Sequence, residues 1–103
     1  MSQKTLIVKL TAAEGKRDEA MAALGRLVDA AEDEPGTLQY VMHADEGDPA
    51  VIWAYEQYAD QAALEAHMTS AAMGEAFGAL GGLLAGPPDM RAVEVVRRKG
   101  EAT

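Results

Sequence analysis

The residues best suited to chemistry lie within positions 56–70, where a histidine shares one side of an expected helix with apolar side chains. Leu64, His67 and Met68 are spaced i, i+3 and i+4, so they project from the same helical face. An imidazole, with an ordinary pKa near ~6.5, is suited to proton transfer at neutral pH. Tyr58 lies just before this helix and adds a hydroxyl group. The stretch therefore predicts a pocket with apolar walls and few polar groups.

A structural role for the same histidine is the alternative. His67 could lie at the edge of the core, hydrogen-bonded to the backbone or to Glu56. The second histidine, His43, is far away in the sequence, and the two lack the HxxxH spacing of a metal site. The acidic turn at 45–48 lacks the spacing of a calcium loop. We therefore expect no metal site.

The composition narrows the possible partners. The chain has 103 residues, and we expect residues 1–103 to form a single domain. It carries 17 acidic and 9 basic residues, a formal charge of −8 that argues against binding to nucleic acid or an anionic membrane surface. It has no cysteine, which excludes disulfides and thiolate chemistry. No apolar run approaches the ~20 residues that a membrane span needs, and no signal-peptide core is evident, so a cytoplasmic protein is expected.

Hydrophobic periodicity defines the elements that must position these residues. Strands are expected at Lys4–Thr11, Thr37–Ala44, Ala50–Tyr58 and Met90–Arg98. One helix should begin after Gly15 and end at the breaker pair Pro35-Gly36. A second helical region should begin at the N-cap Asp60, with Ser70 as a possible second N-cap where it restarts. The order β-α-β-β-α-β predicts a ferredoxin-like α+β fold, an antiparallel sheet with its helices on one face.

The strands are apolar on both faces, although the helices can cover only one. Trp53 and Tyr55 alternate with Ile52 and Ala54, and the sequence does not tell which pair faces the helices. An uncovered face of about 400 Å² would be at the upper end of what monomers expose. A second copy of the chain is the simplest cover, so we expect a homodimer formed through the sheet.

Several of these residues also resemble a known family. The segments Glu34–Tyr40, Tyr55–Tyr58 and Ala63–His67, together with Ser70, resemble the antibiotic biosynthesis monooxygenases, and the similarity extends over residues 4–96. The segments look closest to the quinol-monooxygenase-like members. The resemblance implies a dimeric α+β barrel, in which two sheets pack face to face.

The function implied by the resemblance is oxidation of a small aromatic quinol or polyketide-type phenol with O₂, without metal, flavin, haem or other cofactor. The catalytic residues of the quinone-forming members would fall at Ala54, Tyr58, Leu64 and Gly74, where this chain has other residue types. Phe77 stands where the haem-degrading members have a histidine ligand, so haem is not expected. The alternative is a small-molecule binding or isomerase-type protein on the same scaffold, without oxygenase activity.

Candidate site residues follow from the helical face together with the resemblance. We predict His67 as the catalytic residue, a base that removes a proton from the phenol. The predicted substrate-binding residues are Val8, Met42, Ala54, Glu56, Tyr58, Leu64, Met68 and Phe77.

Overall fold

A computed structural model describes residues 3–100 and contains one antiparallel sheet with helices on one side. The four strands are β1 (Lys4–Thr11), β2 (Thr37–Ala44), β3 (Val51–Tyr58) and β4 (Asp89–Val93). Their order across the sheet is β2-β3-β1-β4, with every neighbouring pair antiparallel. This arrangement confirms the predicted ferredoxin-like α+β fold.

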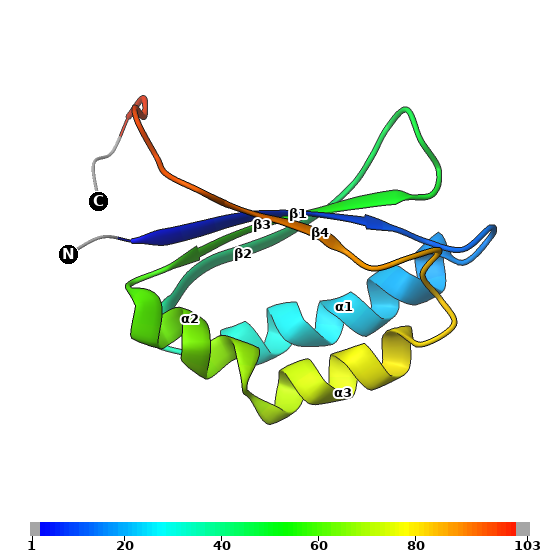
Figure 1. The fold of residues 1–103 in the computed structure, drawn as a ribbon, viewed down its shortest axis with the longest axis horizontal. Helices are drawn as coiled ribbons and strands as arrows, with labels where there is room; N and C mark the ends of the chain where they lie inside the picture. The colour runs from blue at the N-terminus through cyan, green and yellow to red at the C-terminus, as the bar shows by residue number, and fades with distance from the viewer. Residues whose placement is uncertain (1–2, 101–103) are drawn as a thin grey trace.

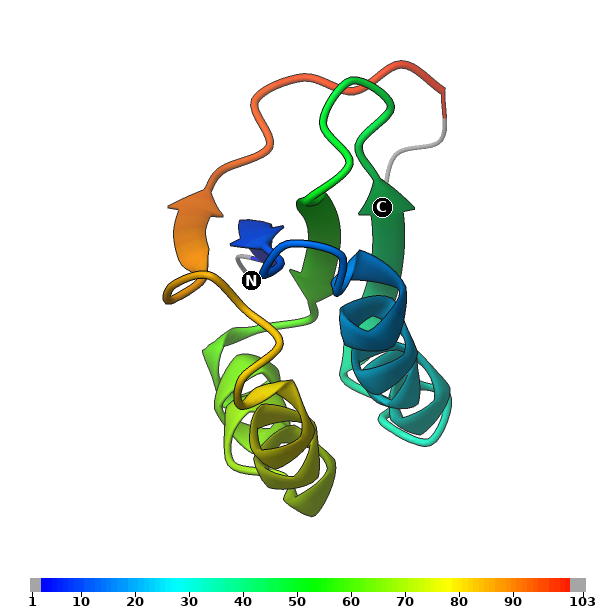
Figure 2. The same ribbon diagram turned by 90° about the vertical axis from the view of Figure 1, so that its right-hand side faces the viewer.

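All three helices lie on the same face of this sheet (Figures 1 and 2). They are α1 (Arg17–Ala31), α2 (Gln61–Met68) and α3 (Ala71–Leu80). The side chain of Asp60 accepts a hydrogen bond from the amide of Ala63 at 2.8 Å, and Ser70 accepts one from the amide of Met73 at 3.2 Å. Both predicted N-caps are therefore present, and Ser70 divides the second helical region into two helices.

Strand alternation determines which residues face the helices. Even-numbered residues of β1 and β3 project into the core, among them Val8, Leu10, Ile52 and Ala54. The odd-numbered residues project to the opposite side, which we call the open face. Its exposed and half-buried apolar members are Ile7, Val41, Trp53, Tyr55 and Val93, whereas Val51 at the start of β3 is 3% exposed. Trp53 and Tyr55 thus lie on the face away from the helices.

The last strand is shorter than the sequence indicates. We expected a strand at residues 90–98, whereas β4 ends at Val93. Val93 pairs with Thr5, and β1 begins at Lys4, so the neighbouring strand offers almost no further partner. A second difference is an irregularity between Thr37 and Gln39, where β2 shifts register against β3. Leu38 lies at this point and is 45% exposed instead of facing the core.

The β2–β3 hairpin is held by side chains of α1, of the turn itself and of β3. Nη1 of Arg17, in the first turn of α1, donates to the carbonyl oxygens of Asp45 and Asp48 at 3.0 and 2.9 Å. The carboxylate of Asp45 accepts from the indole Nε1–H of Trp53 at 2.8 Å. It also accepts from the amides of Gly47 and Asp48. These bonds tie the acidic turn to α1 and to the open face.

Among the described residues, no helix is long and apolar enough to cross a membrane.

Candidate functional site

A small cavity lies between the sheet and the helices. Its volume is about 40 Å³. Every strand and helix except β2 contributes apolar side chains to it, and of the described lining residues only Tyr40 and Glu56 are polar. The lining consists of Val8, Leu10, Leu24, Leu27, Tyr40, Ala54, Glu56, Met68, Met73, Ala76, Phe77, Leu80, Pro88 and Met90. The cavity therefore resembles a small-molecule site in composition, with apolar walls and a few polar groups.

Glu56 is the carboxylate of this cavity. It projects from β3 toward the helices and is 4% exposed. The hydroxyl of Tyr58 donates to its Oε1 at 2.6 Å. Burial raises the pKa of Glu56, whereas the hydrogen bond from Tyr58 and the nearby imidazole of His67 act in the opposite direction. The result is a carboxyl group that accepts a proton more readily than one in water.

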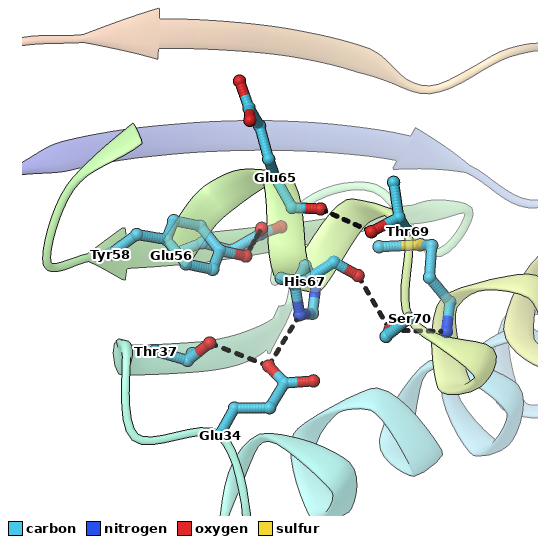
Figure 3. Close-up of polar contacts among 9 residues, drawn as sticks. Glu34, Thr37, Glu56, Tyr58, Glu65, His67, Thr69 and Ser70 are labelled. Atoms are coloured by element: carbon cyan, nitrogen blue, oxygen red, sulfur yellow. Dashed lines mark hydrogen bonds and ion pairs between the residues drawn. The ribbon is translucent and has the colours of Figure 1, made fainter. Parts of the chain in front are cut away.

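His67 lies behind the cavity lining, in a second polar cluster. It is 1% exposed and is the buried residue of α2. Its Nδ1 lies 2.9 Å from Oε1 of Glu34, and Thr37 donates its hydroxyl to the same oxygen at 2.8 Å. Figure 3 shows the imidazole between Glu34 on one side and the Tyr58–Glu56 pair on the other. The other ring nitrogen, Nε2, is buried and has no hydrogen-bond partner among the described residues.

Two tyrosines connect the cavity to this cluster. The rings of Tyr40 and Tyr58 lie 5.4 and 5.3 Å from the imidazole of His67, both in tilted orientations. Burial is the main cause that raises the pKa of each phenol, and the carboxylate of Glu56 adds to it. Both tyrosines therefore remain neutral hydrogen-bond donors at physiological pH.

The predicted site residues fall into two groups. Val8, Ala54, Glu56, Met68 and Phe77 line the cavity. The others, Met42, Tyr58, Leu64 and His67, lie around it: Tyr58 and His67 are fully buried, and Met42 and Leu64 pack against the core. A substrate in the cavity would thus meet Glu56 and Tyr40 before it met His67.

The sequence analysis missed two functional candidates, Glu34 and Tyr40. The pairing of Glu34 with His67 joins residues 33 positions apart, which no local pattern reveals. For Tyr40, alternation with Met42 along β2 placed both on one face, but did not show which face lines a cavity. Both residues lie in the segment 34–40 that carries the family resemblance.

Metal ligation is the remaining chemistry to consider at this site. Within residues 3–100, no three histidine, aspartate or glutamate side chains are grouped so that they could hold a metal ion. Glu34 and His67 are a pair, and the nearby Thr37 and tyrosines supply hydroxyl groups. The arrangement is therefore suited to proton transfer and hydrogen bonding.

These features define the class of protein. The chain is a ferredoxin-like α+β protein with a small, largely apolar cavity between its two layers. Residues 5–79 match the model of the antibiotic biosynthesis monooxygenases, so the chain belongs to that family. No curated protein matches the chain in sequence.

Solved structures share the fold over nearly the whole chain. PA3566 from Pseudomonas aeruginosa is 29% identical, with a TM-score of 0.87, and the match covers 94% of this chain and 97% of that one. A proposed antibiotic biosynthesis monooxygenase from Chloroflexus aurantiacus is also 29% identical, with a TM-score of 0.78 and coverage of 96% and 98%. A protein with the same proposed assignment from Caulobacter crescentus is 24% identical, with a TM-score of 0.87 and coverage of 93% and 92%. The last likeness bears on the fold alone.

Proposed function

We propose that this protein is a cofactor-independent monooxygenase that oxidises a small aromatic quinol or polyketide-type phenol with O₂. The observation that carries the proposal is the cavity itself, in which a buried carboxylate and a phenol are the polar groups on otherwise apolar walls. Membership in the antibiotic biosynthesis monooxygenases and the likeness to proposed monooxygenases support it.

The chemistry begins with removal of a proton from the substrate hydroxyl. Glu56 is the group placed to accept it, because it lines the cavity and burial raises its pKa. The phenolate that results is electron-rich, and it reduces O₂ directly in a site that excludes water. For a hydroquinone, the balanced reaction consumes one O₂ and yields one hydroxyquinone and one water. In this proposal, His67 is a second base, which accepts the proton from Glu56.

The size of the cavity sets a condition on substrate entry. Ligand pockets usually enclose about 300–1,000 Å³, whereas this cavity measures about 40 Å³. It has room for O₂ or water, but an aromatic ring needs the cavity to widen. Phe77 lies at its rim on α3 and is 48% exposed. Rotation of Phe77 or an outward shift of α3 would open the site.

Oxygen uptake with a panel of hydroquinones tests the proposal, in the presence of a chelator and without added cofactor. We expect one O₂ consumed per quinol, and Glu56→Gln should lower kcat about 10²-fold or more, the usual contribution of a positioned base. Glu75→Gln on the exposed side of α3 is the matched control and should retain full activity.

Hydroquinones that bind to the protein without any oxygen uptake would contradict the proposed monooxygenase activity. It would favour the alternative, a small-molecule binding or isomerase-type protein on the same scaffold. Isothermal calorimetry with the same hydroquinones separates binding from turnover.

A further inference from the structure

We propose that Glu34 is a positioning residue that keeps the proton of His67 on Nδ1, so that Nε2 is a buried proton acceptor beside the Tyr58–Glu56 pair. The hydrogen bonds of the resting protein carry this inference. The use of Nε2 as a proton acceptor during turnover rests on the proposed function.

The contacts of Glu34 decide which nitrogen carries the proton. An ionised carboxylate can only accept hydrogen bonds. Its Oε1 lies 2.9 Å from Nδ1 of His67 and also accepts the hydroxyl proton of Thr37 at 2.8 Å. Nδ1 must therefore be the donor, and in the neutral imidazole Nε2 is then the bare nitrogen. The side chain of Glu34 is 23% exposed, so its charge is partly solvated.

The surroundings of Nε2 explain why this assignment is favourable. The nitrogen is buried without a partner among the described residues. A proton on Nε2 would be a buried N–H without an acceptor, and it would leave Nδ1 unable to donate to Glu34. The titratable groups around the imidazole are Glu34 from the loop after α1, Tyr40 from β2, and Glu56 and Tyr58 from β3. These groups leave Nε2 as the free acceptor of the cluster.

An unprotonated Nε2 gives the cluster a nitrogen that can accept a proton. During turnover, Glu56 would take the phenolic proton. The hydroxyl of Tyr58 donates a hydrogen bond to Glu56 at 2.6 Å, and the ring of Tyr58 lies 5.3 Å from the imidazole of His67. His67 would hold that proton as an imidazolium, whose charge Glu34 compensates. The same proton would return through Glu56 to the oxygen that leaves as water, so no proton is lost or gained.

The protonated nitrogen can be observed directly, without substrate, in long-range ¹H–¹⁵N spectra recorded above the titration range of imidazole. We expect the neutral His67 ring with its proton on Nδ1. The signals of His43 can be assigned with His43→Gln, because the chain has two histidines. A proton on Nε2 of His67 in the wild-type protein would overturn the inference, and this measurement needs no variant of the site.

Variants of the loop after α1 give a second readout. Glu34→Ala removes the acceptor, so the proton of His67 should redistribute toward Nε2. Glu32→Ala, an exposed carboxylate in the same loop, is the matched control and should leave the spectrum unchanged. An unchanged His67 spectrum in Glu34→Ala would contradict the positioning role.

Turnover separates this inference from the proposed function. Glu34→Ala should lower kcat about 10-fold or more in the wild-type background, as expected for a group that orients a base. It should cause no further loss in the His67→Ala background, because Glu34 acts through His67. Equal losses in both backgrounds would overturn the inference. If no hydroquinone is oxidised but the proton is found on Nδ1, the proposed function fails and the positioning role stands.

Discussion

Glu56 is a carboxylate in a place that disfavours its charge. It is almost fully buried, and the hydroxyl of Tyr58 donates a hydrogen bond to it at 2.6 Å. Burial is the largest influence on its pKa, which lies above the ordinary value of 4.5. The property that makes Glu56 a proton acceptor therefore also makes its ionised form unfavourable in the folded protein.

Replacing Glu56 with glutamine should make the fold relatively more stable as the pH rises. Because the folded-state pKa is raised, the folded protein binds this proton more tightly than the unfolded chain does. In the wild-type protein, the contribution of this carboxyl group to the unfolding free energy is therefore fully present below its pKa in the unfolded chain. It is lost as the pH rises through its pKa in the folded protein. Urea denaturation at several pH values measures the difference in unfolding free energy between Glu56→Gln and wild type. The difference should increase from acid to neutral pH, and a flat or falling profile would contradict the assignment.

His67→Ala should lower quinol turnover about 10²-fold or more if His67 stores the substrate proton. It should also destabilise the fold by roughly 2–3 kcal/mol, because it removes a fully buried ring and its bond to Glu34. His43→Ala is the control, since His43 is exposed and contacts the carbonyl of Trp53 at the open face. Full oxygen consumption in a destabilised His67→Ala protein would show that the histidine is structural.

The junction between α1, β2 and α2 depends on one glycine. A Cβ at Gly36 would lie 2.5 Å from the Cβ of Ala63 on α2. The carbonyl of Gly36 also accepts the amide of Ala59 at 2.9 Å, which holds the end of β3 against this loop. Because α2 carries His67, this close contact sets the position of the imidazole over the sheet.

Gly36→Ala should therefore destabilise the protein by about 1–3 kcal/mol, the usual cost of overpacking. Ala63→Gly alone should cost about 1 kcal/mol through helix propensity. The double variant should cost less than the sum, because the second change removes the clash. Thermal or urea unfolding of the four proteins measures this coupling. Gly78→Ala, where a Cβ meets nothing within 4 Å, is the control and should not destabilise. Strict additivity would contradict the contact.

Local signals explain how much of this architecture could be predicted. The caps at Asp60 and Ser70 and the change from alternating to helical periodicity are encoded within a few residues, and the element order followed from them. The end of β4, the register shift at Leu38 and the bonds of Arg17 depend on strands and loops distant in sequence. The pairing of Glu34 with His67 is of the same kind, so part of the candidate site was accessible only from the three-dimensional arrangement.

At the scale of the molecule, the open face carries apolar side chains that the helices do not cover. Ile7, Val41 and Val93 are each 38–43% exposed there, and Trp53 and Tyr55 lie between them. Helices cover the opposite face of the sheet (Figure 1). We propose that a second copy packs on the open face, because both copies would bury the same apolar side chains. A stable interface of this kind buries more than about 1,000 Å² in total.

Sedimentation equilibrium at micromolar concentration should therefore give twice the chain mass of 10.9 kDa. Val41→Asp should shift the equilibrium toward monomer, since it places a charge within the apolar contact. Val41 is exposed in the single chain, so this change should leave the fold intact, unlike a change at the buried Val51. Ala22→Asp on the exposed side of α1 is the control. A wild-type protein of 10.9 kDa would contradict the dimer.

Trp53 is the only tryptophan of the chain, and its position gives the molecule an internal fluorescent probe. Its indole N–H is bonded to Asp45, and the ammonium of Lys9 lies 5.7 Å from its ring. The bond to Trp53 is the main cause that lowers the pKa of Asp45 below 3.8. The hydrogen bond between Asp45 and Trp53 should thus persist above pH 3.8 and be lost as the pH falls through the lowered pKa of Asp45. Acid titration of the emission would report the hairpin, whereas dilution at neutral pH would report whether solvent reaches the open face. An emission maximum that shifts on dilution in the wild-type protein, but not in Val41→Asp, would mark the indole as part of the contact between copies.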